Sequence, residues 1–555
     1  MKKIFYIAFL ALIATLMVAC DDSKGRTFEF TAEATCLRES IVYDVKLIDE
    51  DKQLEKSEIK ATRTEKGTKD SKTQTVSFKK GENTTEVKFT GLKPGIKYII
   101  KFTVAFNGKT ITLLEETKET SNQGTKGNPY LIESDKDFNT IVRKAPDGYF
   151  KLTKDINFNN ESILPLFTNS GSDGKFTGEF DGNGKKIYNF TVGSVEADGK
   201  INYSSTAKLN YGLFGYIGDT GKVFNLTLES FNVNVLRSSG TTSGASNFGI
   251  LAGQCVGSIE GVTIKNSTLN VKSSFNQIDS LNVGSIVGRL SEKGTINNVT
   301  VSDTNINVQG SKDAVVGGIC GTTNGSEIIT KAVDGKKVKV NNISGANFLN
   351  GNIKVNISGP TSGTYGTTSS NASESSIGGV VGEVCAARVD NCSSTGKISF
   401  TSDFTTSEDQ RISIGGLVGW NIKDISVISN STSSVVFDIE TFDSPKDEKN
   451  QLLIHAGLLV GRNGGDKSPA YSTVSNCTYT LPQGGENIIK VLTDATIKVD
   501  TNLIGKEVSS SVNNNNISSN DVSIVVVQHE VNSESKTEEV SRYSVNVSAS
   551  VTDAQ

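Results

Sequence analysis

The chain has 555 residues, a formal net charge of −4, 54 glycines, 8 prolines and 2 histidines. This length exceeds one ordinary hydrophobic core and predicts several domains or a repeat array. The small net charge argues against nucleic acid as a partner, and two histidines leave little material for histidine-based catalysis or metal binding.

Residues 1–19 have the pattern of a lipoprotein signal peptide. The cationic start MKK precedes IFYIAFLALIATLMVA, an apolar run too short to span a bilayer comfortably. The run ends at Met17-Val18-Ala19-Cys20, which resembles a bacterial lipobox, where the chain is cut before a cysteine that then carries acyl chains. We therefore predict Cys20 as the lipid attachment site and residues 20–26 as an acylated tether to the membrane. The alternative is an ordinary secretory signal in which Cys20 is incidental.

Two acidic residues, Asp21 and Asp22, directly follow the cysteine. They resemble the surface-export signal of lipoproteins in some Gram-negative bacteria, and this resemblance implies the outer face of the outer membrane. In other bacteria an aspartate at this position means retention at the inner membrane, so the residues alone leave the choice of membrane open.

Residues 27–120 alternate apolar and polar side chains in short runs such as TFEFTAEA, SIVYDVKLID and KYIIKFTVAF. Period-two runs separated by Gly, Asn and Lys clusters predict an antiparallel β-sandwich. Pro94-Gly95 predicts a turn, after which Tyr98 opens a strand with its hydroxyl free to bond back to the corner. The segment resembles a fibronectin type III domain, a module that commonly serves as a spacer.

A glycine-bracketed apolar motif then recurs through the chain. Its seven copies are YGLFG, FGILAG, VGSIVG, VGGICG, IGGVVG, IGGLVG and AGLLVG, with leading glycines at Gly212, Gly249, Gly284, Gly317, Gly378, Gly415 and Gly457. The steps between these glycines are 37, 35, 33, 61, 37 and 42 residues, and the long step predicts an insertion at about 330–371. Nucleotide-binding loops occur once, between a strand and a helix, so seven copies without a following helix exclude that function.

Each motif is followed by two further strand-like pieces, as in VGSIVGRL, GTINNVTV and TNINVQ. Three short strands per repeat predict one coil of a parallel β-helix, whose coils stack at about 4.8 Å. Glycine then passes corners where a Cβ would collide or where φ must be positive. In the second strand an asparagine precedes an apolar slot, which predicts a bend with an asparagine ladder. The proposed pairs are Asn225-Leu226, Asn298-Val299, Asn342-Ile343, Asn391-Cys392 and Asn476-Cys477, with Gly261-Val262 and Val427-Ile428 as variants.

Six cysteines remain besides Cys20. Cys392 and Cys477 occupy a slot filled elsewhere by Leu, Val or Ile, and they lie two predicted coils apart, beyond disulfide reach. We predict free thiols, with Cys385 and Cys392 as the one pair left open.

These repeats resemble GLUG-motif proteins, and the resemblance runs over about 124–505. We therefore expect an all-β chain, with the β-sandwich followed by a parallel β-helix over 124–529 and a C-terminal cap or tail over 530–555. Ser134 with Asp137 is a helix-start signal, so 135–144 is expected to form a short helix that closes the first coil. VSIVVVQHEV and SRYSVNVSASV fit an antiparallel cap at the far end.

No catalytic, cofactor or metal residues are predicted. GLUG repeats occur in some IgA-cleaving metallopeptidases, but His529-Glu530 lacks the second histidine of a zincin helix and lies in a strand pattern. Asp181-Gly182-Asn183-Gly184 lacks the spacing of a calcium loop. The lone tryptophan, Trp420, fits packing as well as docking.

We therefore expect a non-catalytic, surface-exposed lipoprotein that presents its β-helix for adhesion to host matrix, a glycan or other cells. One alternative is a polysaccharide lyase or hydrolase with carboxylates such as Asp438, Asp443, Asp447 and Glu448 in an outer groove, although these fit a solvated loop more simply. A second alternative is a structural or fimbria-associated subunit.

Overall fold

A computed structural model of the chain separates into two compact units, Met1–Asn122 and Gln123–Gln555. Each unit is treated by itself below. The structure describes the following residues: 27–54, 57–168, 174–192, 210–237, 246–273, 281–310, 314–325, 332–333, 336–337, 341–358, 373–403, 410–422, 426–441, 452–464, 472–480, 482, 489–493, 498–507, 511–513, 516–517, 523–531 and 537–546.

The first unit is an antiparallel β-sandwich, as its alternating pattern predicted. One sheet has the order β1-β2-β5 and the other β4-β3-β6-β7. The strands are β1 Glu29–Cys36, β2 Ser40–Ile48, β3 Ile59–Glu65, β4 Ser71–Val76, β5 Thr84–Thr90, β6 Lys97–Phe106 and β7 Lys109–Glu119. Their inward positions form one core, in which Tyr43, Ile100 and Phe102 are fully buried. The likeness to fibronectin type III domains remains a resemblance.

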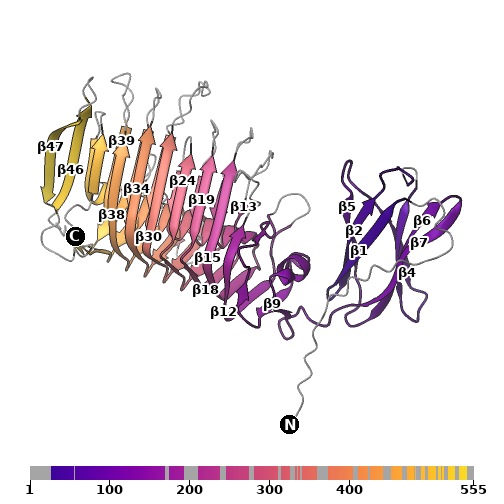
Figure 1. Cartoon of the computed structure of the whole chain (residues 1–555). Helices are drawn as coiled ribbons and strands as arrows, with labels where there is room; N and C mark the ends of the chain where they lie inside the picture. Colours follow the sequence, from indigo (N-terminus) through magenta and orange to yellow (C-terminus); the bar gives the residue numbers. More distant parts are fainter. Residues whose placement is uncertain are drawn as a thin grey trace, which may run out of the picture. The chain divides into compact units, whose positions relative to one another are not determined.

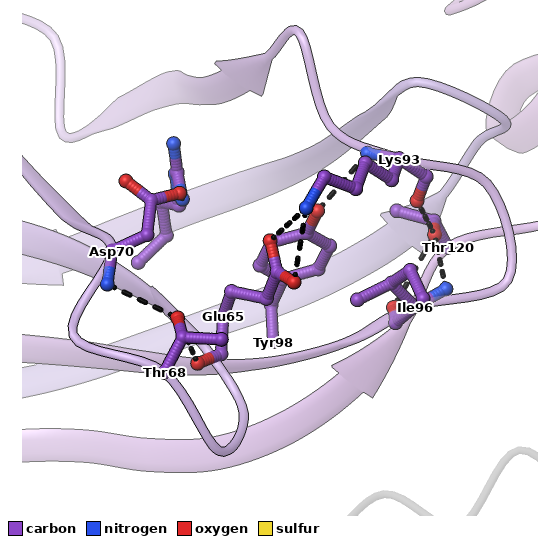
Figure 2. Close-up of polar contacts among 8 residues, drawn as sticks. Glu65, Thr68, Asp70, Lys93, Ile96, Tyr98 and Thr120 are labelled. Carbon is purple, nitrogen blue, oxygen red and sulfur yellow. Dashed lines mark hydrogen bonds and ion pairs between the residues drawn. The ribbon is translucent and has the colours of Figure 1, made fainter.

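Tyr98 ties the corner of this sandwich together (Figure 2). Its hydroxyl accepts a hydrogen bond of 3.0 Å from the backbone N–H of Lys93, as the sequence predicted. The Lys93 ammonium lies 3.0 Å from a Glu65 carboxylate oxygen, and the Lys93 carbonyl accepts a 2.6 Å bond from the Thr120 hydroxyl. Because Tyr98 is 1% exposed, losing its hydroxyl would leave a backbone donor unsatisfied at a buried corner.

The second unit is a parallel β-helix, so the predicted fold class is confirmed (Figure 1). Its described strands form mainly one sheet of 22 strands and one of 14. The repeated glycine motif builds the 14-stranded sheet, and the second and third pieces of each repeat build the larger one. In Figure 1 the strands β12, β15, β19, β24, β30, β34 and β38 follow one another along the solenoid.

Each glycine motif contributes two short strands separated by a bend. The strands before the bend are β13 Asn210–Tyr211, β16 Ser246–Gly249, β20 Leu281–Gly284, β25 Ala314–Gly317, β31 Ser373–Gly378, β35 Gln410–Gly415 and the first part of β39 Leu452–Asn463. The strands after the bend are β14 Phe214–Ile217, β17 Ala252–Cys255, β21 Val287–Glu292, β26 Cys320–Gly325, β32 Val381–Val384, β36 Val418–Asn421 and the end of β39.

The larger sheet holds the rest of each coil. Its first strands are β8 Tyr130–Ile132, β9 Tyr149–Leu152, β10 Ile156–Asn157, β11 Ser162–Ile163, β12 Glu179–Val192, β15 Lys222–Arg237, β18 Ser258–Lys265 and β19 Thr268–Ser273. The middle strands are β22 Thr295–Asn297, β23 Thr300–Ser302, β24 Asn305–Gly310, β29 Asn341–Ser344, β30 Asn347–Ser358, β33 Ala387–Asp390 and β34 Ser393–Asp403. The last are β37 Val427–Ser429, β38 Thr432–Thr441, β40 Thr473–Ser475, β41 Thr478–Tyr479, β42 Ile489–Thr493, β44 Ser511–Asn513 and β45 Asn516–Ile517.

The leading glycines of the motif are stacked in register. Gly249 pairs with Gly284, Gly284 with Gly317, and the pairing continues through Gly378, Gly415 and Gly457. Asn502 of β43, Lys498–Glu507, pairs with Gly457, and Ser511 of β44 pairs with Thr473. An eighth coil therefore stacks on the seventh, although it lacks the complete glycine motif.

Steric collision, not backbone conformation, explains these glycines. A Cβ on Gly415 would lie 2.0 Å from the Val418 carbonyl oxygen, and one on Gly253 would lie 2.2 Å from the Tyr211 backbone nitrogen. The strands after the bend thus lie directly against the backbone of the strands before it in the preceding coil. Packed sheets with side chains between them are about 10 Å apart, so this approach requires residues without a Cβ.

The predicted bend in the second strand is present, but two of its positions were misassigned. Asn225, Gly261, Asn298, Asn391 and Asn476 have φ between 52° and 61°. The equivalent residue in the fourth coil is Gly345 (φ 62°), not Asn342, because Asn342 pairs with Thr295. In the sixth coil it is Asn430 (φ 50°), not Val427, because Ile428 pairs with Val389. Both errors are shifts of three residues, because each of these repeats has a second buried apolar residue, Ile343 or Ile428, three positions before the slot.

The insertion predicted over 330–371 is not one segment. Residues 341–358 form β29 and β30, which pair with β22, β23 and β24 as regular parts of a coil. The additional length lies on either side of these strands. On the first side, β27 Ala332–Val333 pairs antiparallel with β28 Lys336–Lys337; residues 359–372 lie outside the described residues.

The two ends of the solenoid differ from the coils between them. The helix expected over 135–144 is shorter, a π-helix η1 at Phe138–Val142, whose Phe138 ring packs 5.3 Å from that of Phe158. The Asp137 carboxylate accepts the Ser134 backbone N–H at 2.9 Å, which is one half of the expected capping arrangement. At the other end β46 Ser523–Val531 pairs antiparallel with β47 Thr537–Asn546, so the boundary expected at residue 529 falls inside a strand.

Candidate functional site

One column of the solenoid changes chemistry from each coil to the next; five of its members are half-exposed, whereas Thr322 and Arg462 are buried. It consists of the residue directly after the second glycine of each motif, and we call it the varied column: Tyr216, Gln254, Arg289, Thr322, Glu383, Trp420 and Arg462. Stacking imposes the same steric demand on every coil, so it explains columns that repeat. It does not explain a column that holds two aromatic rings, an amide, a hydroxyl and charges of both signs.

A second column provides the contrast. Its members pair in register along the second strands and carry hydroxyl or amide groups: Thr227, Thr263, Thr300, Asn347, Ser393, Thr432 and Thr478. We call it the threonine column. Half-exposed β-branched or small polar residues are what a solvated sheet surface requires, so this column needs no function.

A groove lies at the corner between the two sheets in the first coils. Its volume is about 340 Å³. We call it the corner groove, and its lining residues are Glu179, Asp219, Thr220, Gly221, Lys222, Val256, Gly257, Ser258, Lys293 and Thr295. Glu179, Lys222, Ser258 and Thr295 are register partners in four successive coils. A Cβ on Gly257 would lie 2.1 Å from the Gly221 carbonyl oxygen, so the floor of the groove is bare backbone.

The charged groups of the corner groove divide into two kinds. Glu179 pairs with Lys126 at 3.1 Å, and Lys222 pairs with Glu260 at 3.1 Å. Asp219 and Lys293 are exposed and form no ion pair within the described part of the chain. These two groups are therefore available to a ligand.

The varied column adjoins this groove through Tyr216. Burial raises the pKa of the Tyr216 phenol, and the negative charges of Glu292 and Asp219 raise it further, whereas Arg289 opposes them. The phenol thus stays neutral and able to donate a hydrogen bond. In the next coil the Gln254 amide donates a 3.1 Å bond to the Ser291 hydroxyl.

Sequence reasoning did not identify the corner groove. It considered Trp420 alone among the varied column, without its register partners. The signal was nevertheless present, because the residue after the second glycine changes between every two successive motifs. The groove could be recognised only from the structure, which pairs Glu179 with Lys222 and Lys222 with Ser258 in neighbouring coils.

The other predicted residues do not converge on one site. Trp420 is held in place, with its indole N–H donating to the Gly464 carbonyl at 3.0 Å and the Arg462 guanidinium 4.5 Å from its ring centroid. Asp438 pairs with Lys397 at 2.8 Å, and Asp443, Asp447 and Glu448 lie outside the described residues. The carboxylate cluster of the enzymatic alternative is therefore not assembled in the described residues.

The turn and strand interpretations of two further motifs agree with the structure. Asp181 accepts the Asn183 backbone N–H at 2.7 Å, forming a local turn. His529 and Glu530 lie in β46, a strand, as their pattern indicated. Over the described residues, no group of three His, Cys, Asp or Glu side chains is placed to hold a metal ion.

The six cysteines from Cys36 onward are free, so the pair Cys385 and Cys392 is not bridged. Cys20 and the rest of residues 1–26 lie outside the described residues. No helix in the described ranges has the length and apolar character needed to cross a membrane.

A family model also matches one of the repeats that the strand register defines. The family model of the GLUG motif matches residues 373–399, which run from β31 through β32 and β33 into β34. These are one motif, its bend and the beginning of the following strands. The chain thus carries a GLUG motif within its parallel β-helix.

Parts of this chain are similar to segments of two larger proteins. Halomucin of Haloquadratum walsbyi is 32% identical over 149 residues, which cover 25% of this chain and 1% of that protein. A putative Gly-rich membrane protein of Evansella cellulosilytica is 30% identical over 155 residues, covering 26% of this chain and 15% of that protein. The chain thus spans only a small part of the relatives it matches.

Among solved structures, an IgA1 protease aligns with 82% of this chain and 30% of its own length. The TM-score is 0.30 and the sequence identity 12%.

Proposed function

We propose that this GLUG-motif protein is a non-catalytic surface lipoprotein that uses one face of its β-helix for binding. Its ligand would be a host matrix protein, a glycan or another cell. The observation that carries the proposal is the varied column, whose side chains differ at each coil although the fold imposes a repeat. A purely structural subunit would have no reason to diversify one column.

The names of the two similar proteins support a location at the cell boundary, since one is described as halomucin and the other as a membrane protein. We propose Cys20 as the lipid attachment site and the outer membrane of a Gram-negative cell as the location. Two or more acyl chains hold a protein stably at a membrane, where one does not. Neither of these relatives is named as an enzyme, in line with a binding role.

The anchor and the binding role are tested on intact cells. Cells that produce the full chain are expected to retain it in the membrane fraction and to bind at least one member of a matrix-protein and glycan panel. A Cys20→Ala variant is expected in the soluble fraction, with loss of cell binding but not of binding by the purified protein. Membrane retention of Cys20→Ala would overturn the anchor, and absence of any binding by parent cells would overturn the binding role.

The enzymatic alternative is tested with the same panel. Polysaccharide cleavage with calcium present, abolished by one carboxylate substitution, would replace the binding proposal with a lyase or hydrolase.

A further inference from the structure

The corner groove offers donors and acceptors in nearly equal measure. Asp219 accepts hydrogen bonds, Lys293 donates them, and the hydroxyls of Thr220, Ser258 and Thr295 do both. The Thr220 hydroxyl donates to the Thr177 carbonyl at 2.8 Å, and the hydroxyls of Thr295 and Ser258 lie 3.2 Å apart. Each of these oxygens keeps lone pairs that can accept from a ligand hydroxyl.

The charges of the groove cancel. Glu179 and Asp219 oppose Lys222 and Lys293, and two of the four are already neutralised by Lys126 and Glu260. An anionic chain would approach Asp219, and a cationic chain would approach Lys293. A neutral ligand with many hydroxyls avoids both conflicts.

The dimensions favour an extended ligand. Four register partners at about 4.8 Å per coil span about 14 Å along the solenoid. A pyranose ring in an extended chain is about as long as one coil spacing, so successive sugars meet successive coils. Tyr216 lies three residues before Asp219, is half-exposed, and carries an aromatic ring of the kind that sugar C–H groups stack on.

We infer that the corner groove binds a segment of an uncharged polysaccharide laid along the coil axis, with Asp219 and Lys293 as its polar contacts. The inference rests on the proposed binding function and names the ligand class of its site. The ring of Tyr216 contributes stacking.

The test is calorimetric titration of the full chain with hexasaccharides. The neutral probes are cellohexaose, maltohexaose and mannohexaose, and the charged probes are hexagalacturonate and a chitosan hexamer. At least one neutral probe is expected to bind more tightly than both charged probes. Tighter binding of a charged probe, or no binding of any neutral probe, would overturn the inference.

Variants assign the binding to the groove. Asp219→Ala/Lys293→Ala is expected to weaken binding about tenfold or more, as loss of charge-assisted hydrogen bonds requires. The matched control Lys397→Ala/Asp438→Ala also removes one charge of each sign from the outer surface, and it is expected to bind like the parent. Tyr216→Ala is expected to bind at least about tenfold more weakly. Parent-like binding by the Asp219/Lys293 double variant contradicts the inference.

Failure of the inference and of the proposed function give different results. If no neutral probe binds but parent cells still adhere to a matrix protein, the ligand class is wrong and the binding role stands. If parent cells bind nothing in the panel, the binding role itself falls.

Discussion

Single glycines bring two stacks of strands into backbone contact in every GLUG coil. Gly415 illustrates the constraint, because its missing Cβ would lie 2.0 Å from the Val418 carbonyl oxygen and 2.6 Å from the Gly461 backbone nitrogen. Neither atom can rotate away, since both belong to the backbone of packed strands. The constraint is local and steric, and it recurs in each coil.

Gly415→Ala is therefore expected to destabilise the solenoid by about 1–3 kcal/mol, the usual cost of overpacking a rigid core. The measurement is the urea midpoint of unfolding, monitored by the fluorescence of Trp420, since the only tryptophan of the sequence lies in β36, the strand after the bend. Gly127→Ala is the control, because a Cβ there meets nothing within 4 Å. Equal midpoints for the two variants would show that the glycine contact is not tight.

Buried and half-exposed asparagines form two ladders with the same geometry. Asn247 donates to Asn210 at 2.8 Å and accepts from Asn282 at 2.8 Å, with Asn247 only 2% exposed. Asn270 donates to Asn234 and accepts from Asn307, also at 2.8 Å, but on the half-exposed surface. Burial is thus the main difference between them.

Asn247→Ala is expected to cost about 1–3 kcal/mol, because it leaves two buried amides without their partners. Asn270→Ala should cost less than about 1 kcal/mol, since water replaces the lost bonds. The two variants are compared by their urea midpoints. Equal losses of unfolding free energy would mean that burial does not determine how much a ladder hydrogen bond stabilises the protein.

At the scale of the element, the bend of the second strand determines which residues fill its apolar slot. Cys392, Ser431 and Cys477 occupy this slot in three successive coils, and each donates to the carbonyl two residues earlier, at 3.3, 2.7 and 3.4 Å. Cysteine thus serves here as a small buried residue with a weak donor. The predicted distance of two coils between Cys392 and Cys477 agrees with this register.

Alkaline pH is expected to destabilise these coils through their thiols. Burial raises the pKa of Cys255 to about 12, of Cys392 to about 12 and of Cys477 to about 11. Because the folded pKa values exceed that of a free thiol (about 8.5), the unfolded chain loses these protons first. Stability is then fully present below about pH 8.5 and falls as pH rises towards 12.

The measurement is urea unfolding between pH 8 and 11, repeated with Cys392→Ser, which matches Ser431 of the next coil. The loss with pH should be smaller in that variant. Alkylation of Cys255, Cys392 and Cys477 in the native protein at pH 8 within minutes would contradict their burial.

Across the solenoid, the interior changes from aromatic to small and polar. Phe138, Phe158, Phe190 and Phe231 form a continuous series of ring contacts with centroid distances of 5.3, 4.1 and 4.6 Å. The later coils instead bury serines, with Ser426, Ser431, Ser433 and Ser472 at most 1% exposed. The stacked phenylalanine rings are expected to bury more apolar area in the N-terminal coils, at about 25 cal/mol of stabilisation per Å².

Because solenoid stability is approximately a sum over neighbouring coils, the N-terminal coils are expected to resist local opening more strongly. Native-state hydrogen exchange should show slower exchange in β12 and β15 than in β38 and β40. Uniform protection across these strands, or faster exchange in β12, would contradict a polarised solenoid.

Local pattern was sufficient for much of this protein. The spacing of Gly249, Gly284 and Gly317 predicted stacked coils, because a solenoid repeats the same steric demand along the chain and therefore shows it as periodicity. The alternation around Tyr98 predicted a sandwich with a bonded corner, since strand faces follow a period of two. Free thiols followed from the same reasoning, because Cys392 and Cys477 occupy an aliphatic position.

Only the tertiary structure decided the features that depend on pairing between coils. Asn342 and Val427 were misassigned by three residues because a second apolar residue lies three positions before the slot in each of these repeats, and only hydrogen bonding to the neighbouring coil selects between the two positions. The groove around Asp219 and Lys293 escaped notice for the same reason, since its residues come from separate coils. Sequence periodicity reports what each coil has in common, whereas a binding surface is built from what differs between coils once they are stacked.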